Sequence, residues 1–124
     1  MTYLDTHAAI WLRDGDHDAF EKRSQRAIAA DDVLLISPMV VLELQILYEK
    51  NKVVDPSDEI VGDLVGFGVR ICDYPFPLVV EKAVNEEWTR DPFDRIITAH
   101  ARARRAALVT HDALIRANYD LALW

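Results

Sequence analysis

Four acidic side chains occupy positions from which carboxylates can do chemistry together. Asp5 and Asp112 each follow a short apolar run of strand length. Asp94 lies just after Pro92 at the start of one helical pattern, and Glu43 lies in the middle of another. Carboxylates that crowd together repel one another and stay ionised only with cations between them. Oxygen ligands without Cys or His select Mg²⁺ or Mn²⁺, and such ions activate water for phosphodiester hydrolysis.

The stretch that contains Asp94 organises the chain. Since proline is tolerated at the first helical position, Pro92 makes Asp91 the N-cap and Asp94 the third helical residue. Apolar residues recur at helical spacing from Phe93 to Ala103 and form a stripe that faces the core. The pair of aspartates is therefore either part of a site or only a capping arrangement for the backbone N–H groups.

Glu43 lies on the apolar side of a helix that is expected to run from Ser37-Pro38 to about Asn51. It is about 200° around the helix from the polar residue Gln45, at roughly 100° per residue. Its neighbours three and four positions away are Met39, Val40, Ile46 and Leu47. A carboxylate on a buried face is costly unless it is paired or ligated. The alternatives are a hydrogen-bonded buried Glu, or one that reaches an edge of the core.

Asp5 and Asp112 also have a simpler interpretation, because each could be no more than the N-cap of the helix after it. However, both are expected just beyond the carboxyl ends of strands. In open parallel α/β sheets these ends line the ligand crevice. Asp94 begins the helix that leads into the fourth strand, so its position relative to this crevice depends on the strand order.

Apolar runs alternate with helical patterns along the chain. This alternation predicts an α/β fold with three layers (αβα) and a central parallel sheet of about five strands. The expected strands are Thr2–Leu4, Val33–Ile36, Val69–Cys72, Ala107–Thr110 and Leu121–Trp124. Besides the helices that begin at Ser37-Pro38 and at Pro92, the expected helices are Ala8–Leu12, Asp18–Ala30 (ended by Asp31-Asp32), Asp58–Val65, Leu78–Trp88 and Ala113–Ala117.

The composition fits one domain that spans residues 1–124, since 51% of the residues are hydrophobic. The single cysteine, Cys72, excludes an internal disulfide and suits core packing in a reducing cytosol. Neither an export signal nor a membrane span is expected, so we expect a cytoplasmic protein. The net charge of −7 disfavours non-specific attraction to polyanions, although bound cations would reverse the local sign at a carboxylate site.

Four motifs in this order and at these spacings resemble the PIN-domain ribonucleases, most closely the toxin subunits of VapBC-type toxin–antitoxin pairs. The resemblance covers essentially the whole chain. The motifs are Tyr3-Leu4-Asp5-Thr6-His7-Ala8, Ile36-Ser37-Pro38 leading to Glu43, Arg90-Asp91-Pro92-Phe93-Asp94-Arg95, and Leu108-Val109-Thr110-His111-Asp112.

The resemblance implies a three-layer PIN-like fold and cleavage of RNA by a metal-activated water. It places the catalytic and metal-binding carboxylates on four positions, with Asp91 as an outer candidate, and implies Mg²⁺ or Mn²⁺ as the cofactor. The four positions are Asp5, Glu43, Asp94 and Asp112. Thr6 and Thr110 match small hydroxyl positions near the site, where a hydrogen bond could orient a carboxylate; for Thr6 we favour ordinary capping.

The resemblance also implies partners. Toxins of this type usually form homodimers, and they are inhibited by an antitoxin whose tail lies over the active site. The alternatives are a PIN nuclease without an antitoxin, and a non-catalytic metal-binding or regulatory domain of the same fold. A receiver-like domain lacks support, because the last lysine, Lys82, lies well before Asp94.

Other polar residues near these motifs carry weaker signals. His7 and His111 flank two of the acidic residues, but we leave both out of the site because an all-oxygen site suits Mg²⁺ better. Five arginines give the helix that begins at Pro92 a basic flank that could follow an RNA backbone. They are Arg90, Arg95, Arg102, Arg104 and Arg105. For Arg104 and Arg105 we favour solvated side chains that complement the helix dipole.

Overall fold

Five strands in the described part of the chain form one sheet, and every neighbouring pair is parallel. The computed structural model describes residues 1–30 and 33–124. The strand order is β3-β2-β1-β4-β5. The strands are β1 (Thr2–Leu4), β2 (Leu34–Ile36), β3 (Val69–Ile71), β4 (Ala107–Val109) and β5 (Ala122–Leu123). The expected parallel sheet of about five strands is confirmed.

The central strand β1 pairs with β2 on one side and with β4 on the other, so that Tyr3 lies opposite both Leu35 and Leu108. These three side chains are almost completely buried. Continuous apolar runs are what a parallel strand needs when helices cover both faces of its sheet. The short strands therefore lie in the middle of the hydrophobic core, between the two layers of helices.

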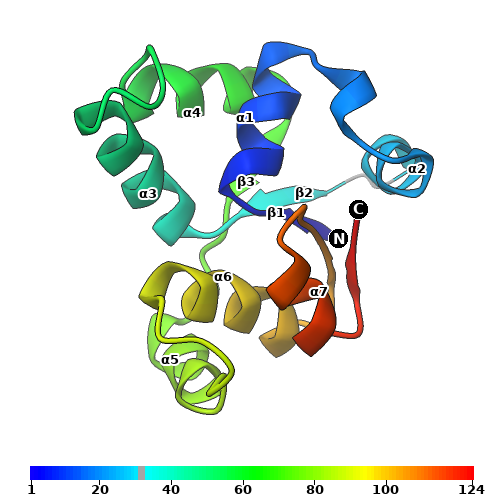
Figure 1. Cartoon of the computed structure of the whole chain (residues 1–124), viewed down its shortest axis with the longest axis vertical. Helices are drawn as coiled ribbons and strands as arrows, with labels where there is room; N and C mark the ends of the chain where they lie inside the picture. The colour runs from blue at the N-terminus through cyan, green and yellow to red at the C-terminus, as the bar shows by residue number, and fades with distance from the viewer. Residues whose placement is uncertain (31–32) are drawn as a thin grey trace.

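Helices cover both faces of the sheet, as Figure 1 shows. Helices α1, α3 and α4 lie on one side of the strands, and α5, α6 and α7 lie on the other. Their bounds are α1 (Thr6–Asp14), α2 (Lys22–Ala30), α3 (Pro38–Glu49), α4 (Ser57–Gly66), α5 (Phe76–Val84), α6 (Pro92–Ala103) and α7 (Ala113–Asn118). The three-layer α/β architecture predicted from the sequence is confirmed.

The prediction of one helix over Asp18–Ala30 is wrong for its first turn. A short 3₁₀ helix, η1 (His17–Ala19), comes first, and α2 begins only at Lys22. Between them Phe20 has an extended backbone and is 4% exposed, because its ring packs into the core. The expected stop at Asp31-Asp32 lies outside the described residues.

The helix expected over Leu78–Trp88 is also displaced, since α5 runs from Phe76 to Val84. Proline is compatible with the first turn of a helix, so Pro77 does not delay its start. The helix ends early because Glu86 leaves the helical path and binds Arg102 of α6. The other boundaries lie close to their expected positions, although α1 begins at Thr6 because Asp5 caps it. No helix of the described residues is both long enough and apolar enough to cross a membrane.

Candidate functional site

The carboxyl ends of β1 and β4 lie side by side at the centre of the sheet. The chain leaves β1 toward α1, and the Asp5 N–H donates to the carbonyl of Val109 at 3.1 Å. One neighbour of β1 is the next strand in sequence, β2, and the other is the distant strand β4. This is the position where the strand order reverses, which is where parallel α/β sheets form their ligand crevice.

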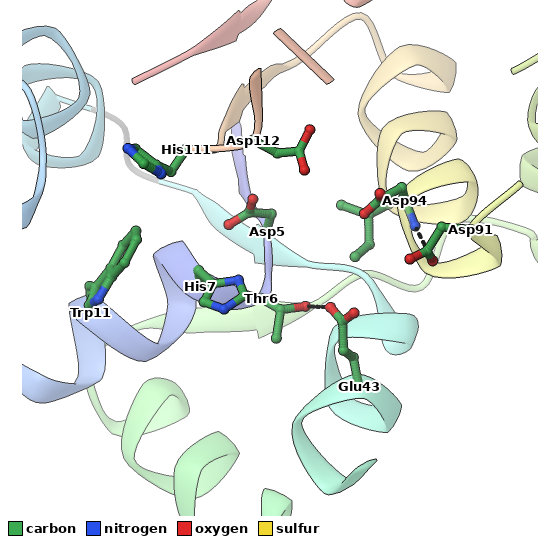
Figure 2. Close-up of a pocket in the computed structure, with 10 residues that line it drawn as sticks. Asp5, Thr6, His7, Trp11, Glu43, Asp91, Asp94, His111 and Asp112 are labelled. Atoms are coloured by element: carbon green, nitrogen blue, oxygen red, sulfur yellow. Dashed lines mark hydrogen bonds between the residues drawn. The ribbon is translucent and has the colours of Figure 1, made fainter. Parts of the chain in front are cut away.

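A pocket of about 480 Å³ opens at this position. Acidic side chains from four parts of the fold reach it, and Figure 2 shows them around a common space. The pocket is lined by Asp5, Thr6, His7, Trp11, Glu43, Asp91, Asp94, Ile97, His111 and Asp112. All five carboxylates named from the sequence therefore lie at one pocket, although they are up to 107 positions apart in the chain (112 − 5).

Asp5 and Asp112 are held by the helices that follow them. Asp5 caps α1 by accepting a hydrogen bond from the Ala8 N–H at 2.8 Å, and Asp112 caps α7 by accepting from the Ile115 N–H at 2.8 Å. Thr110 connects the two aspartates. Its hydroxyl donates a hydrogen bond to the Asp5 carboxylate and accepts one from the Asp112 N–H. The capping interpretation is thus correct for both, and the caps also fix the two carboxylates at the pocket.

Burial changes the ionisation of Asp5. Its side chain is 7% exposed, and loss of water around the carboxylate raises its pKa. Hydrogen bonds from Thr110 and from the Ala8 N–H act in the opposite direction, while the nearby charge of Glu43 raises the pKa further. Asp5 is therefore a carboxylate whose charge the protein itself only partly compensates.

Asp91 and Asp94 occupy the positions predicted from the Asp-Pro signal. Asp91 is the N-cap of α6 and accepts hydrogen bonds from the backbone N–H groups of Phe93 at 2.8 Å and Asp94 at 3.3 Å. The Asp94 side chain points toward the pocket (Figure 2), and burial raises its pKa to about 7. Repulsion by four other carboxylates adds to this increase. In order of effect they are Asp91, Asp112, Glu43 and Asp5.

Glu43 is half-buried rather than buried, and it reaches the pocket from the middle of α3. The hydroxyl of Thr6 donates a hydrogen bond to its Oε1 atom. The capping role favoured for Thr6 is wrong, since Asp5 is the cap and Thr6 is the first residue of α1. Thr6 instead connects the first helix to the carboxylate of the third.

Three ring side chains complete the pocket, and sequence reasoning did not place them in the site. His7, Trp11 and His111 line the side of the pocket away from Asp91 and Asp94 (Figure 2). A local signal was available for the two histidines, because His7 follows Asp5 by two residues and His111 directly precedes Asp112. Trp11 had no such signal, since an aromatic residue in an apolar helical run usually packs in a core.

The basic flank of α6 does not line the pocket. Arg90 and Arg95 donate to the backbone carbonyls of Glu87 and Thr89. Arg105 is exposed, and Arg104 is partly exposed with its guanidinium over the Tyr74 ring, 5.6 Å from the ring centroid. The pocket lining has no Lys or Arg among the described residues.

The chemistry of the donor set fits a hard divalent cation. The carboxylates offer oxygen alone, which is the ligand type that Mg²⁺ and Mn²⁺ prefer. The raised pKa values of Asp5 and Asp94 indicate uncompensated negative charge that a cation would relieve. Within residues 1–30 and 33–124, however, no group of three or more His, Cys, Asp or Glu side chains is already arranged as a metal site. Side-chain rotation would therefore have to accompany ion binding.

Comparison with known proteins agrees with this architecture. A family model described as PIN domain matches residues 2–121. A toxin–antitoxin complex from Klebsiella pneumoniae is similar in structure, with a TM-score of 0.66 and 18% identity over 100% of this chain and 97% of that chain. VapBC2 from Rickettsia felis bound to a promoter DNA fragment has a TM-score of 0.65 and 23% identity over 100% and 98% of the two chains.

A third similar structure is DNA-bound VapBC from Salmonella typhimurium, with a TM-score of 0.61 and 17% identity over 98% of this chain and 93% of that chain. At these identities the three structures establish the shared fold and nothing finer. The comparison with curated proteins finds no match.

Proposed function

Because the chain belongs to the PIN-domain family, we propose that it is a metal-dependent endoribonuclease and the toxin of a toxin–antitoxin pair. One observation carries the nuclease proposal. Carboxylates from the β1–α1 junction, from α3, from the start of α6 and from the β4–α7 junction meet at one pocket. Phosphodiester hydrolysis by metal-activated water needs such a set of oxygen ligands.

We assign catalysis and metal binding to four residues, with Asp91 as an outer ligand. The four are Asp5, Glu43, Asp94 and Asp112. A bound Mg²⁺ or Mn²⁺ ion supplies activation of water and neutralisation of charge on the phosphate. The assignment is supported by the all-oxygen lining and by the repulsion that raises the pKa of Asp94.

Other residues of the chain orient these carboxylates. Thr6 donates to Glu43, and Thr110 bonds Asp5 while it accepts from the backbone N–H of Asp112. Such outer hydrogen bonds restrict the rotation of a ligand and are worth roughly 10- to 100-fold in metal affinity or activity. Ile97, three positions after Asp94 on α6, is an apolar residue of the lining and is 2% exposed.

The proposed partners are an antitoxin and a second copy of this chain. The similar structures are a toxin–antitoxin complex and two VapBC complexes, which supports an antitoxin partner. We propose that the antitoxin covers the pocket. Exposed apolar side chains on α5, including Phe76, Leu78 and Val84, offer a surface for association. Light scattering on the purified chain tests the homodimer, and co-purification with the product of an adjacent small gene tests the antitoxin.

Cleavage of total RNA by the purified chain, freed of any bound partner, tests the nuclease. We expect discrete products with Mg²⁺ or Mn²⁺, none with EDTA, and none from Asp5→Asn or Asp94→Asn. Asp73→Asn is a matched control, because Asp73 is an exposed aspartate that follows β3 at the same edge of the sheet but does not line the pocket. Metal-independent cleavage, or full activity of the two pocket variants, would contradict the proposal. Metal binding without cleavage of any RNA would favour the non-catalytic alternative.

A further inference from the structure

The rings at the pocket form a continuous cluster that the metal chemistry does not use. The Trp11 ring centroid lies 5.8 Å from that of His7 and 6.0 Å from that of His111. The two imidazoles are exposed, and Trp11 is half-buried between them. All three side chains line the same pocket as the carboxylates. We call these three residues the ring wall.

Buried aromatic residues hold the ring wall from behind. The Trp124 ring lies 5.1 Å from Trp11 and 4.9 Å from His111, and Phe20 lies 5.1 Å from Trp124. Trp124 and Phe20 are at most 5% exposed. A ring that is already fixed in place loses little conformational freedom when a ligand packs against it. The ring wall is thus a preorganised surface beside the proposed site of cleavage.

The remainder of the pocket leaves few other ways to hold a nucleic acid. Its lining has no Lys or Arg within the described residues, and the opposite side carries Asp91 and Asp94. The whole chain has a net charge of −7. Attraction of phosphates to basic side chains, the usual source of affinity for nucleic acid, is therefore missing at this pocket. Ring faces are the surfaces here that can contact a nucleobase favourably, because stacking needs no charge.

We propose that His7, Trp11 and His111 stack a nucleobase of the substrate and so position the adjacent phosphodiester over the carboxylates. This rests on the proposed nuclease function and specifies its substrate class as single-stranded RNA, whose unpaired bases are free to stack on side chains. Ring faces accept any base, so the ring wall fixes the position of the substrate and contributes little to sequence preference.

Binding of a short fluorescently labelled single-stranded RNA, followed by anisotropy, tests the ring wall, with Ca²⁺ in place of Mg²⁺ so that the carboxylates hold a hard divalent cation. A denaturing gel confirms that the RNA stays intact during the titration. We expect His7→Ala and His111→Ala each to weaken binding about 5- to 10-fold, since stacking of one base is worth roughly this much or more. His7→Phe and His111→Phe keep a ring and should bind within about twofold of the wild type on the same ground. His17→Ala is the matched control, because His17 is an exposed histidine outside the pocket.

An RNA of equal length that carries abasic sites separates stacking from other effects. It should bind the wild type as weakly as the intact RNA binds the alanine variants, and the substitutions should then have no further effect. If the alanine variants lose equal affinity for intact and abasic RNA, or if the phenylalanine variants bind as weakly as the alanine variants, the proposal that the ring wall stacks a base is refuted. Trp11→Phe and Trp11→Leu repeat the comparison at the central ring, with circular dichroism to confirm folding.

The two proposals fail in different ways. If the chain cleaves RNA with Mg²⁺ or Mn²⁺ and the alanine variants bind RNA and retain KM as the wild type does, only the ring wall is refuted. If the wild type neither binds nor cleaves any RNA, both proposals are refuted.

Discussion

Replacement of Asp94 by Asn should stabilise the metal-free protein at neutral and alkaline pH. Burial and four neighbouring carboxylates raise the pKa of Asp94 from 3.8 to about 7. The folded state therefore keeps a proton that the unfolded chain releases between about pH 4 and pH 7. Stability falls as pH rises through this window, because the unfolded state binds fewer protons there. Above pH 7 the full electrostatic cost of the Asp94 charge is present, and an uncharged amide removes it.

The size of the effect follows from the pKa difference of about 3, which corresponds to about 4 kcal/mol at 1.36 kcal/mol per pKa unit. Asp94 is only half-buried, so solvent screens much of this energy. We therefore expect Asp94→Asn to gain about 1–2 kcal/mol in the free energy of unfolding at pH 8. For a chain of this length the corresponding rise in Tm is about 4–8 °C.

Urea denaturation in EDTA, followed by circular dichroism at pH 4 and at pH 8, measures this gain. The variant should match the wild type at pH 4 and exceed it at pH 8, while Asp73→Asn should change neither. Added Mg²⁺ or Mn²⁺ should then stabilise the wild type more than the variant, because a ligand that binds the native state raises its stability. A variant that is less stable than the wild type at pH 8, or a gain that is equal at both pH values, would refute the electrostatic reasoning.

Three further substitutions test the supports of the site and of the fold. Thr6→Val removes the hydroxyl that orients Glu43 and should lower nuclease activity about 10-fold or more with the fold intact, whereas Thr6→Ser should retain activity in the same cleavage assay. Asp91→Ala removes the N-cap of α6 and should cost about 1 kcal/mol in urea denaturation at pH 4, where the neighbouring Asp94 is protonated; Asp91→Ser should restore most of it. Glu86→Ala removes the buried carboxylate that accepts from Arg102, and it should lower the free energy of unfolding by about 1–2 kcal/mol, because Arg102 is 39% exposed and solvent screens its charge; a loss below 0.5 kcal/mol would contradict that role.

Local signals in the sequence were sufficient for most elements of the fold. The continuous apolar runs around Leu35 and Leu108 predicted buried parallel strands, and Pro92 correctly predicted Asp91 as a cap. Element bounds were wrong where a long-range contact prevailed over the local pattern. Phe20 interrupts an expected helix because its ring packs in the core, and Glu86 ends another because it pairs with α6.

The site required information that no local pattern contains. Asp94 could not be placed at the crevice until the strand order put β4 beside β1, since its helix precedes β4 in the chain. Thr6 and Glu43 are 37 positions apart, and nothing near Thr6 indicates the partner of its hydroxyl. The contact of Trp11 with Trp124 joins the first helix to the residue after the last strand, β5, and is equally non-local.

Anomalous diffraction from crystals of this chain grown with Mn²⁺ would test the central claim most directly, namely that the four carboxylates form one divalent-metal site. We predict a manganese peak in the pocket, within coordination distance of carboxylate oxygens from Asp5 and Asp94 and of at least one of Glu43 and Asp112. The same peak should be absent from crystals of Asp94→Asn. A pocket without manganese at saturating Mn²⁺, or an ion bound only elsewhere on the chain, would contradict the claim.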